Sequence, residues 1–217
     1  NSALLDLIRQ LGGNPHSHTL GGPEEQVWDV RPFFESIHSE SSQGGNGGAP
    51  TPPLPRSHTA DEFDMHTDCS FEDPPPRYVA LYVVREDQCG GGRSTLIDTD
   101  ALNRYISRKS LQTLMNTDFT VSVPPEFFKG QESIKMKLVT REEKLWKYRS
   151  DIIDRNNCTD AQLSALDELD SLLRSPSLVL TTMLPTGSLL LLDNMRWFHG
   201  RSAIKDQNRW LKRVRFH

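Results

Sequence analysis

Short apolar runs separated by long polar segments dominate the chain. The run at residues 78–84 is β-branched, aromatic and almost entirely apolar, which predicts a central β-strand. Shorter runs of strand-like composition or alternating pattern lie at residues 27–32, 94–98, 119–123, 134–140, 178–182, 188–193, 196–204 and 209–216. Many short strands with long excursions between them predict a β-sandwich or jelly-roll barrel with helices packed outside.

Three segments have helical periodicity. Residues 159–175 show it most clearly, with leucines at helical spacing and Thr159 as a candidate N-cap. Residues 98–116 have apolar positions at roughly helical spacing, and either Asp98 or Thr99 is a candidate N-cap. Residues 1–13 predict a short amphipathic helix that ends at two glycines. Because the chain opens inside this helix, we expect further residues to precede it.

The composition fits one domain with long loops. The chain has 217 residues, of which 35% are hydrophobic, so we expect a single domain over residues 1–217. Residues 39–58 are rich in Gly, Ser and Pro and poor in apolar side chains. Such a composition cannot form a core, and it predicts a flexible loop. The loop ends just before a candidate metal motif, which makes it a candidate lid.

Charge and cysteine content exclude several classes of partner. A formal net charge of -4 gives no general attraction to nucleic acid or to an anionic membrane. No apolar run approaches the roughly 20 residues that a membrane helix needs. The 3 cysteines, without CxxC spacing, argue against a disulfide framework and a cysteine zinc site. We therefore expect a cytoplasmic protein with a small-molecule partner; the pattern favours no oligomeric state.

The stretch FDMHTDC places His66 two residues before Asp68. In a strand, residues i and i+2 face the same side about 6.6 Å apart, so both side chains can meet on one metal ion. In a helix the same spacing would point them apart. The motif alone is a weak signal that more often marks a solvated turn, and a third ligand is needed to favour a metal site.

Two later segments carry further candidate chemistry. His199 follows an apolar strand and a Trp-Phe pair, which indicates a buried place, although a core histidine bonded to a carbonyl would fit as well. The stretch RWLKRVRF puts Arg209, Arg213 and Arg215 on one strand face. Such arginines repel unless an anion meets them, and arginine forks bind carboxylates bidentately. This face predicts a carboxylate receptor; a solvated edge strand is the alternative.

Four motifs in this order resemble one enzyme family: HTD at 66–68, GGGRSTL at 90–96, FHGR at 198–201 and RWLKR at 209–213. Together they are similar to the TauD/TfdA (taurine dioxygenase-like) family of Fe(II)/2-oxoglutarate dioxygenases, which includes clavaminate synthase-like members. The resemblance runs from about Val27 to the C-terminus. The family fold is a double-stranded β-helix, a cupin-like jelly-roll, in agreement with the mainly β pattern and its flanking helices.

The resemblance implies roles for individual residues. It implies a two-histidine, one-carboxylate Fe(II) site formed by His66, Asp68 and His199. Arg213 would pair with the far carboxylate of 2-oxoglutarate, and Thr95 would help to hold the same group. Arg209 matches a second family arginine near the co-substrate or substrate. Arg215 has no implied role, so the interpretation as a solvated edge residue stays for it. The GGGRST turn is longer than the commoner GGxT, which leaves this loop's geometry open.

The resemblance also implies a reaction. An enzyme of this family oxidises its substrate with O2 and 2-oxoglutarate and releases succinate and CO2. We expect a small polar or amino-acid-like substrate and hydroxylation, with desaturation or cyclisation as other outcomes. The alternatives are a cupin-like metal-binding module without oxygenase activity, a metal-dependent hydrolase or isomerase, and a scaffold whose arginine-rich tail binds an acidic partner. Only the dioxygenase requires a receptor for 2-oxoglutarate.

Overall fold

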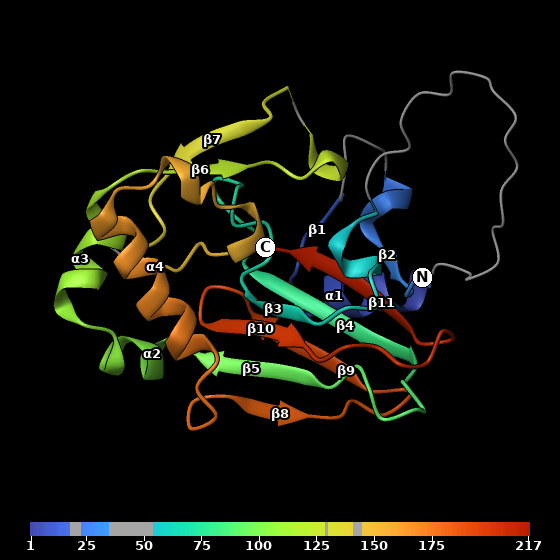
Figure 1. Cartoon of the computed structure of the whole chain (residues 1–217). Helices are drawn as coiled ribbons and strands as arrows, with labels where there is room; N and C mark the ends of the chain where they lie inside the picture. The colour runs from blue at the N-terminus through green and yellow to red at the C-terminus, as the bar shows by residue number, and fades with distance from the viewer. Residues whose placement is uncertain (18–22, 35–53, 129, 141–144) are drawn as a thin grey trace, which may run out of the picture.

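The computed structural model describes residues 1–17, 23–34, 54–128, 130–140 and 145–217. Two antiparallel sheets dominate it, with three helices grouped on one side (Figure 1). The larger sheet consists of β1 (Pro15–His16), β2 (Trp28–Val30), β4 (Tyr78–Arg85), β9 (Leu189–Asp193) and β11 (Trp210–Phe216). The smaller sheet consists of β3 (Phe63–His66), β5 (Ser94–Asp98), β8 (Leu180–Thr182) and β10 (Trp197–Arg201).

Strand β11 organises the larger sheet. The strand order is β1-β11-β4-β9, and β2 also pairs with β11. The two short N-terminal strands pair with different parts of it: Pro15 lies opposite Phe216, and Trp28 lies opposite Arg213. Strand β4 pairs with β11 along its whole length. In the smaller sheet the order is β3-β10-β5-β8, so β10 lies between β3 and β5.

Apolar side chains from both sheets meet between them. Val79 of β4, Leu96 of β5 and Leu192 of β9 form one buried cluster. Because successive residues of a strand point to opposite faces, Ile97 points away from this cluster, and it belongs to the main apolar core instead. The smaller sheet therefore has an inner face toward the larger sheet and an outer face toward the helices.

The helices begin and end at local sequence signals. The α-helices are α1 (Ser2–Gln10), α2 (Thr99–Tyr105), α3 (Arg108–Asn116) and α4 (Asp160–Leu173). Thr159 and Gln162 form a capping box at the start of α4, as the sequence predicts for Thr159. Short 3₁₀ turns are η1 (Pro23–Gln26), η2 (Arg56–His58), η3 (Pro125–Phe127), η4 (Ser150–Ile152) and η5 (Arg155–Asn157).

The single helix expected at residues 98–116 is two helices. Asp98 caps α2, since its side chain accepts a hydrogen bond from Asp100 N at 3.0 Å. The helix then breaks at Ile106 and Ser107, whose backbones are extended. Glu168 of α4 accepts hydrogen bonds from both the backbone N (2.6 Å) and the Oγ (2.8 Å) of Ser107. A carboxylate 61 residues away thus holds the break, and periodicity could not have revealed it.

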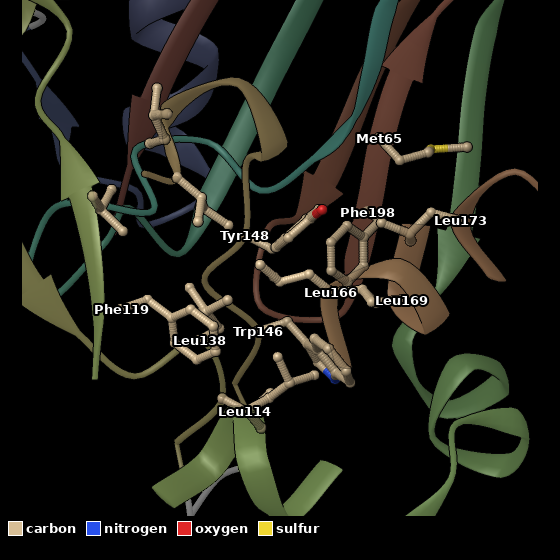
Figure 2. Close-up of a cluster of buried hydrophobic side chains, with 14 of the residues drawn as sticks. Met65, Leu114, Phe119, Leu138, Trp146, Tyr148, Leu166, Leu169, Leu173 and Phe198 are labelled. Carbon is tan, nitrogen blue, oxygen red and sulfur yellow. The ribbon is translucent and has the colours of Figure 1, made fainter. Parts of the chain in front are cut away.

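The main apolar core lies on the outer face of the smaller sheet (Figure 2). Phe198 of β10 packs there at 0% exposure, beside Trp146 and Tyr148. Leu166 and Leu169 of α4 cover them from the other side. A small hairpin of β6 (Phe119–Ser122) and β7 (Ser133–Met136) closes the far end of this core. The main apolar core therefore supports the smaller sheet from its outer face.

Two expectations from the sequence concern the candidate lid and membrane-spanning helices. Residues 39–53 of the candidate lid lie outside the described residues, and Arg56–His58 form η2. Within the described ranges, no helix is both long and apolar enough to span a membrane.

Candidate metal centre

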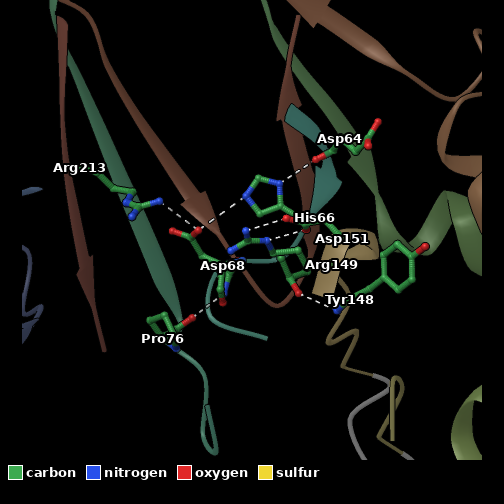
Figure 3. A network of polar contacts seen from close by, with 10 residues as sticks. Asp64, His66, Asp68, Pro76, Tyr148, Arg149, Asp151 and Arg213 are labelled. Carbon is green, nitrogen blue, oxygen red and sulfur yellow. Dashed lines mark hydrogen bonds and ion pairs between the residues drawn. The ribbon is translucent and has the colours of Figure 1, made fainter. Parts of the chain in front are cut away.

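The structure brings His66, Asp68 and His199 together. His66 ends β3 and lies directly opposite His199 of β10, with ring centroids 4.4 Å apart. The Oδ1 atom of Asp68 is 3.7 Å from Nε2 of His66 (Figure 3). One ligand atom from each residue can be chosen so that all three lie within 4.8 Å of one another, and all three side chains are buried. The trio that the resemblance implies is thus one compact cluster.

Asp68 reaches the cluster through a turn. Strand β3 ends at His66, and Cys69 directly after Asp68 has a positive φ of 50°. The amide of Asn194 holds the turn from the other sheet: its Oδ1 accepts from Asp68 N at 2.8 Å. Its Nδ2 donates to the carbonyls of Asp68 (3.0 Å) and Pro76 (2.9 Å). Asn194 is 1% exposed, and the sequence motifs did not single it out.

The polar atoms of the trio are arranged for a metal ion. Nδ1 of His66 donates to the Asp64 carbonyl at 2.8 Å, which leaves Nε2 with its lone pair toward Asp68. Oδ2 of Asp68 and Nδ1 of His199 are buried and have no hydrogen-bond partner within the described ranges. Buried polar atoms without partners are rare and costly. A bound cation would satisfy them, so the residues present fit a metal centre.

Burial and neighbouring charges set the protonation states of Asp68 and His199. Burial would raise the pKa of Asp68, but the charge of the nearby Arg213 guanidinium outweighs it and holds that pKa well below its usual range. Burial, together with the neighbouring His66, lowers the pKa of His199 to about 3. The carboxylate is therefore ionised and the His199 imidazole neutral at neutral pH. These are the protonation states that metal coordination requires.

Two cavities meet at the trio. Cavity A is lined by both histidines and, among others, by Ser94, Arg201, Arg209 and Arg213. Cavity B lies on the Asp68 side and is lined by Trp28, Cys69, Glu126, Phe127, Arg149 and Arg213, among others. Ser57, Phe63, His66 and Arg213 line both. A metal ion at the trio would thus face two small adjoining cavities, with volumes of about 70 Å³ for cavity A and about 10 Å³ for cavity B.

The structure does not bring Thr95 to this site. Ser94 and Leu96 face the interior of the sandwich, so the intervening Thr95 points outward. Thr95 lines cavity C instead, a space of about 480 Å³ between the smaller sheet and α4. On β5, the hydroxyl that lines cavity A belongs to Ser94. Ser94 and Thr95 are adjacent in the strand, so they face opposite sides of the sheet.

Arg209 lies in cavity A next to the glycine turn. It is 5% exposed, and its Nη1 has no hydrogen-bond partner in the described parts of the chain. Burial lowers the pKa of Arg209 to about 10, while Asp87 opposes the shift. A Cβ atom on Gly92, whose φ is +60°, would lie 2.7 Å from Arg209 Nε. Only glycine lets the turn approach the guanidinium this closely.

The carboxylate of Asp87 joins the glycine turn before Ser94 to the loop that contains Arg209. Its carboxylate accepts from the backbone N atoms of Cys89 (2.8 Å) and Gly91 (3.1 Å) in the glycine turn. It also accepts from those of Lys205 (2.7 Å) and Asp206 (3.1 Å), which lie before β11. These backbone bonds outweigh the effect of burial and lower the pKa of Asp87. Sequence motifs missed Asp87, because its partners are backbone groups more than 100 residues apart.

Arg201 holds the described end of the candidate lid. It is 7% exposed and donates to the carbonyls of Thr59 and Asp61. The backbone of Ile204 also donates to the carbonyl of Ala60 at 2.7 Å. These bonds fix the segment after η2 against β10. They place Ser57 where the two cavities meet.

Arg213 and Arg215 both face the interior of the sandwich. Arg213 donates to Oδ1 of Asp68 at 3.3 Å and is 8% exposed. Arg215 is only 2% exposed, so its interpretation as a solvated edge residue is wrong. The edge of the larger sheet beside β11 is covered by β1 and β2; a strand was expected at residues 27–32, where β2 lies, but its pairing with β11 was not. On the other side of the site, Arg149 makes a bidentate ion pair with Asp151, with both bonds at 2.8 Å (Figure 3).

The chain was compared with families and with known proteins. The family model "Taurine catabolism dioxygenase TauD, TfdA family" matches residues 2–215. The chain belongs to this family. The membership predicted from the four motifs is therefore confirmed. A comparison with curated proteins gave no match.

Solved structures of iron oxygenases share the TauD/TfdA-type jelly-roll fold. An asparagine oxygenase in complex with Fe(II), hydroxyasparagine and succinate is 20% identical with a TM-score of 0.68; the match covers 88% of this chain and 56% of that one. The non-heme iron oxygenase OrfP with Fe, succinate and dihydroxy-arginine is 17% identical with a TM-score of 0.69, covering 99% and 65%. OrfP is also known with Fe and alpha-ketoglutaric acid, at 18% identity, a TM-score of 0.69 and coverage of 98% and 63%. The chain thus spans 56% to 65% of the length of these proteins.

Proposed function

We propose that this protein is an Fe(II)/2-oxoglutarate-dependent dioxygenase that oxidises a small, polar, amino-acid-like molecule. The observation that carries the proposal is the buried trio of His66, Asp68 and His199, placed where cavities A and B meet. Membership of the TauD/TfdA family supports the choice of iron and 2-oxoglutarate. Two histidines and one carboxylate are the ligand set of non-haem iron oxygenases.

The trio would hold the metal, and the protein's own groups prepare it. Fe(II) bound there, with 2-oxoglutarate and O2, would supply the oxidising chemistry and release succinate and CO2. The Asp64 carbonyl fixes the ring of His66, and Phe63 stacks on it with centroids 3.9 Å apart. The Asn194 amide fixes the backbone of Asp68. These contacts set ligand orientation before any metal arrives, which is how outer contacts tune a metal site.

Within cavity A, Arg209 and Ser94 would receive the far carboxylate of 2-oxoglutarate, and Arg213 lines the same cavity beside Asp68. When its keto end lies at the metal, its second carboxylate lies two methylene groups away. Arg213 contacts the metal ligand Asp68 itself, and Thr95 faces cavity C. Arg209 and Ser94 line cavity A together, and Arg209 has an unpartnered Nη1. A guanidinium and a hydroxyl of this kind bind a carboxylate strongly.

Cavity B is then the compartment for the substrate. Arg213 lines both cavities beside Asp68, and cavity B has a volume of only about 10 Å³ in this structure, so a substrate would enter it only after side chains at its rim move. The asparagine oxygenase and OrfP structures contain hydroxylated amino acids, which supports a substrate of amino-acid type. Hydroxylation is the expected outcome on the same grounds.

A spectroscopic titration tests the proposal. Fe(II) and then 2-oxoglutarate are added to the protein without oxygen, and the visible charge-transfer band of the chelated co-substrate is recorded. We expect the band in the unmodified protein and its loss or a much weaker 2-oxoglutarate affinity in Arg209→Met. A control, Lys212→Met, removes a cation that faces Asp29 on the other side of β11 and should leave the band unchanged. Iron binding without a band would instead favour a cupin-like binding module.

A further inference from the structure

Thr67 lies between the metal ligands His66 and Asp68, and a distant segment of the chain holds it. Thr67 is 2% exposed. Its backbone N donates to the carbonyl of Tyr148 at 2.9 Å, and its Oγ1 accepts from the backbone N of Tyr148 at 3.0 Å. Two reciprocal bonds thus join residues that are 81 positions apart. Because the bonds use both the backbone and the side chain of Thr67, this residue cannot turn or shift without moving Tyr148.

The turn that carries Asp68 is held from two sides. Cys69, which follows it, has a φ of 50°, in the left-handed region that is unfavourable for a residue other than glycine. Such a conformation persists only where the surrounding contacts fix it. The Asn194 amide holds the N and the carbonyl of Asp68 from the side of the larger sheet. The bond pair between Thr67 and Tyr148 holds the preceding residue from the side of the main apolar core.

Tyr148 is itself fixed by the main apolar core. The residue is 1% exposed, and its ring lies beside Phe198, with centroids 6.1 Å apart (Figure 2). Its hydroxyl donates to Oδ1 of Asp170 on α4, and Arg155 pairs with the other oxygen of that carboxylate. Burial raises the pKa of the Tyr148 phenol and Asp170 raises it further, so the phenol stays protonated and remains a donor. A continuous set of contacts therefore runs from α4 to the ligand motif.

The residues on either side of Tyr148 bind the same stretch of chain. Lys147 donates to Asp73 at 2.9 Å. The guanidinium of Arg149 lies over the ring of Phe63, with 5.4 Å between Cζ and the ring centroid. Phe63 and Asp73 come before and after the ligand motif in the sequence. Three consecutive residues thus support the motif from before its start to beyond its end.

We propose that Thr67 and Tyr148 are positioning residues of the metal centre. Tyr148, anchored on Asp170, holds Thr67 through its backbone. The bond pair sets how the ligands on either side of Thr67 are oriented before a metal binds, and contacts behind metal ligands change metal affinity in this way. The inference rests on the proposed function only in placing a metal at the trio, and it does not depend on the co-substrate or the substrate.

The chain contains a matched control for this bond pair. The backbone N of Thr140 donates to the carbonyl of Leu145 at 2.9 Å, and its Oγ1 accepts from the backbone N of Leu145 at 3.0 Å. These are the same two bonds, at the same lengths, as those between Thr67 and Tyr148. Among the described residues, Thr140 lines neither cavity A nor cavity B. Loss of such a hydroxyl should lower stability at both places and metal affinity only at Thr67.

Anaerobic equilibrium dialysis of Fe(II) compares the two places. Thr67→Val removes the hydroxyl and keeps the shape of the side chain, and it should weaken Fe(II) binding about tenfold or more. Thr67→Ser keeps the hydroxyl, so it should bind Fe(II) nearly as tightly as the unmodified protein. Thr140→Val should bind Fe(II) as the unmodified protein does, although it should unfold at a lower temperature. The visible charge-transfer band should be weaker or shifted only in Thr67→Val.

Tyr148→Phe tests the link to α4, because it keeps the ring in the core and removes only the bond to Asp170. In the metal-free protein the backbone amides of residues 67 and 148 should exchange faster with solvent, which hydrogen exchange followed by NMR measures. Fe(II) binding should also weaken, but less than in Thr67→Val. This variant decides the question if Thr67→Val does not fold. Unchanged exchange and unchanged Fe(II) affinity in Tyr148→Phe would contradict the anchoring role of its hydroxyl.

The outcomes separate this inference from the proposed function. Equal Fe(II) affinities in Thr67→Val and Thr140→Val, together with a normal charge-transfer band, would overturn the inference alone. A weakened Thr67→Val that Thr67→Ser does not restore would also oppose it, since the hydroxyl would not be the cause. Fe(II) binding without the band, still weakened in Thr67→Val, would contradict the proposed function and support the inference. A protein that binds no Fe(II) would contradict both.

Discussion

Phe198 and His199 are neighbours on β10, yet they belong to opposite kinds of environment. Phe198 packs into the apolar core under α4, where the contacts are aromatic and aliphatic. His199 points to the inner face, among His66, Asp68 and the arginines of β11. The first face stabilises the fold through burial, and the second buries polar atoms without partners. The smaller sheet thus supplies rigidity on its outer face and binding capacity on its inner face.

Replacing each neighbour should separate stability from metal binding. Phe198→Ala should lower the free energy of unfolding by about 3–5 kcal/mol, because it leaves a cavity in the main core. His199→Ala should change it by about 1 kcal/mol or less in the metal-free protein, because the imidazole lines cavity A rather than the packed apolar core. Its Fe(II) binding should fall beyond detection. Urea unfolding measures the stability and equilibrium dialysis measures the iron binding. A stability loss in His199→Ala as large as that in Phe198→Ala would contradict the division of roles between the two faces.

Asp87 tests whether the loops of the inner face depend on one ionised carboxylate. Asp87→Asn should lower the free energy of unfolding by about 2–3 kcal/mol at pH 7, since an amide oxygen is a weaker acceptor for the backbone N–H groups. Because folding lowers the pKa of Asp87, its contribution is complete above the unfolded value of about 3.9 and is lost as pH falls through the folded value.

The stability difference between Asp87→Asn and the unmodified protein should therefore shrink as pH falls from about 5 to below 3. Unfolding curves at several pH values measure it. Glu168→Gln is a useful control in the other region, since its carboxylate holds Ser107 at the break between α2 and α3 and Ser110 in the first turn of α3. It should leave the affinity for 2-oxoglutarate unchanged, whereas Asp87→Asn should weaken it. An unchanged affinity in Asp87→Asn would remove the link between Asp87 and Arg209.

The sequence predicted best what depends on local pattern. The strands and the helix capped by Thr159 follow from alternation, periodicity and a capping signal, and these are the elements that the structure contains. The break at Ser107 and the clamp by Asn194 escaped prediction because each depends on a hydrogen bond to a distant segment. The burial of Arg215 escaped for a related reason: β1 has only 2 residues, and the expected strand at β2 gave no sign that it pairs with β11.

The metal trio was predictable because several motifs coincide. His66 and Asp68 were ambiguous as a pair, and the resemblance to a family placed His199 beside them. The sequence could not decide which of two adjacent residues faces inward, since register depends on the length of the glycine turn. Thr95 and Ser94 differ by one position in β5 and lie on opposite faces. An assignment that is wrong by one residue in a strand therefore places the side chain on the wrong face of the sheet.

This pair gives the smallest and most local test of the two faces. Ser94→Ala should raise the Kd for 2-oxoglutarate about fivefold, which corresponds to about 1 kcal/mol for one hydrogen bond to a carboxylate. Thr95→Val, which keeps the shape of its side chain, should leave that Kd within about twofold, because Thr95 faces cavity C. The anaerobic charge-transfer titration measures both. The reverse order would mean that β5 presents its other face to the metal, and it would return the role of carboxylate ligand to Thr95.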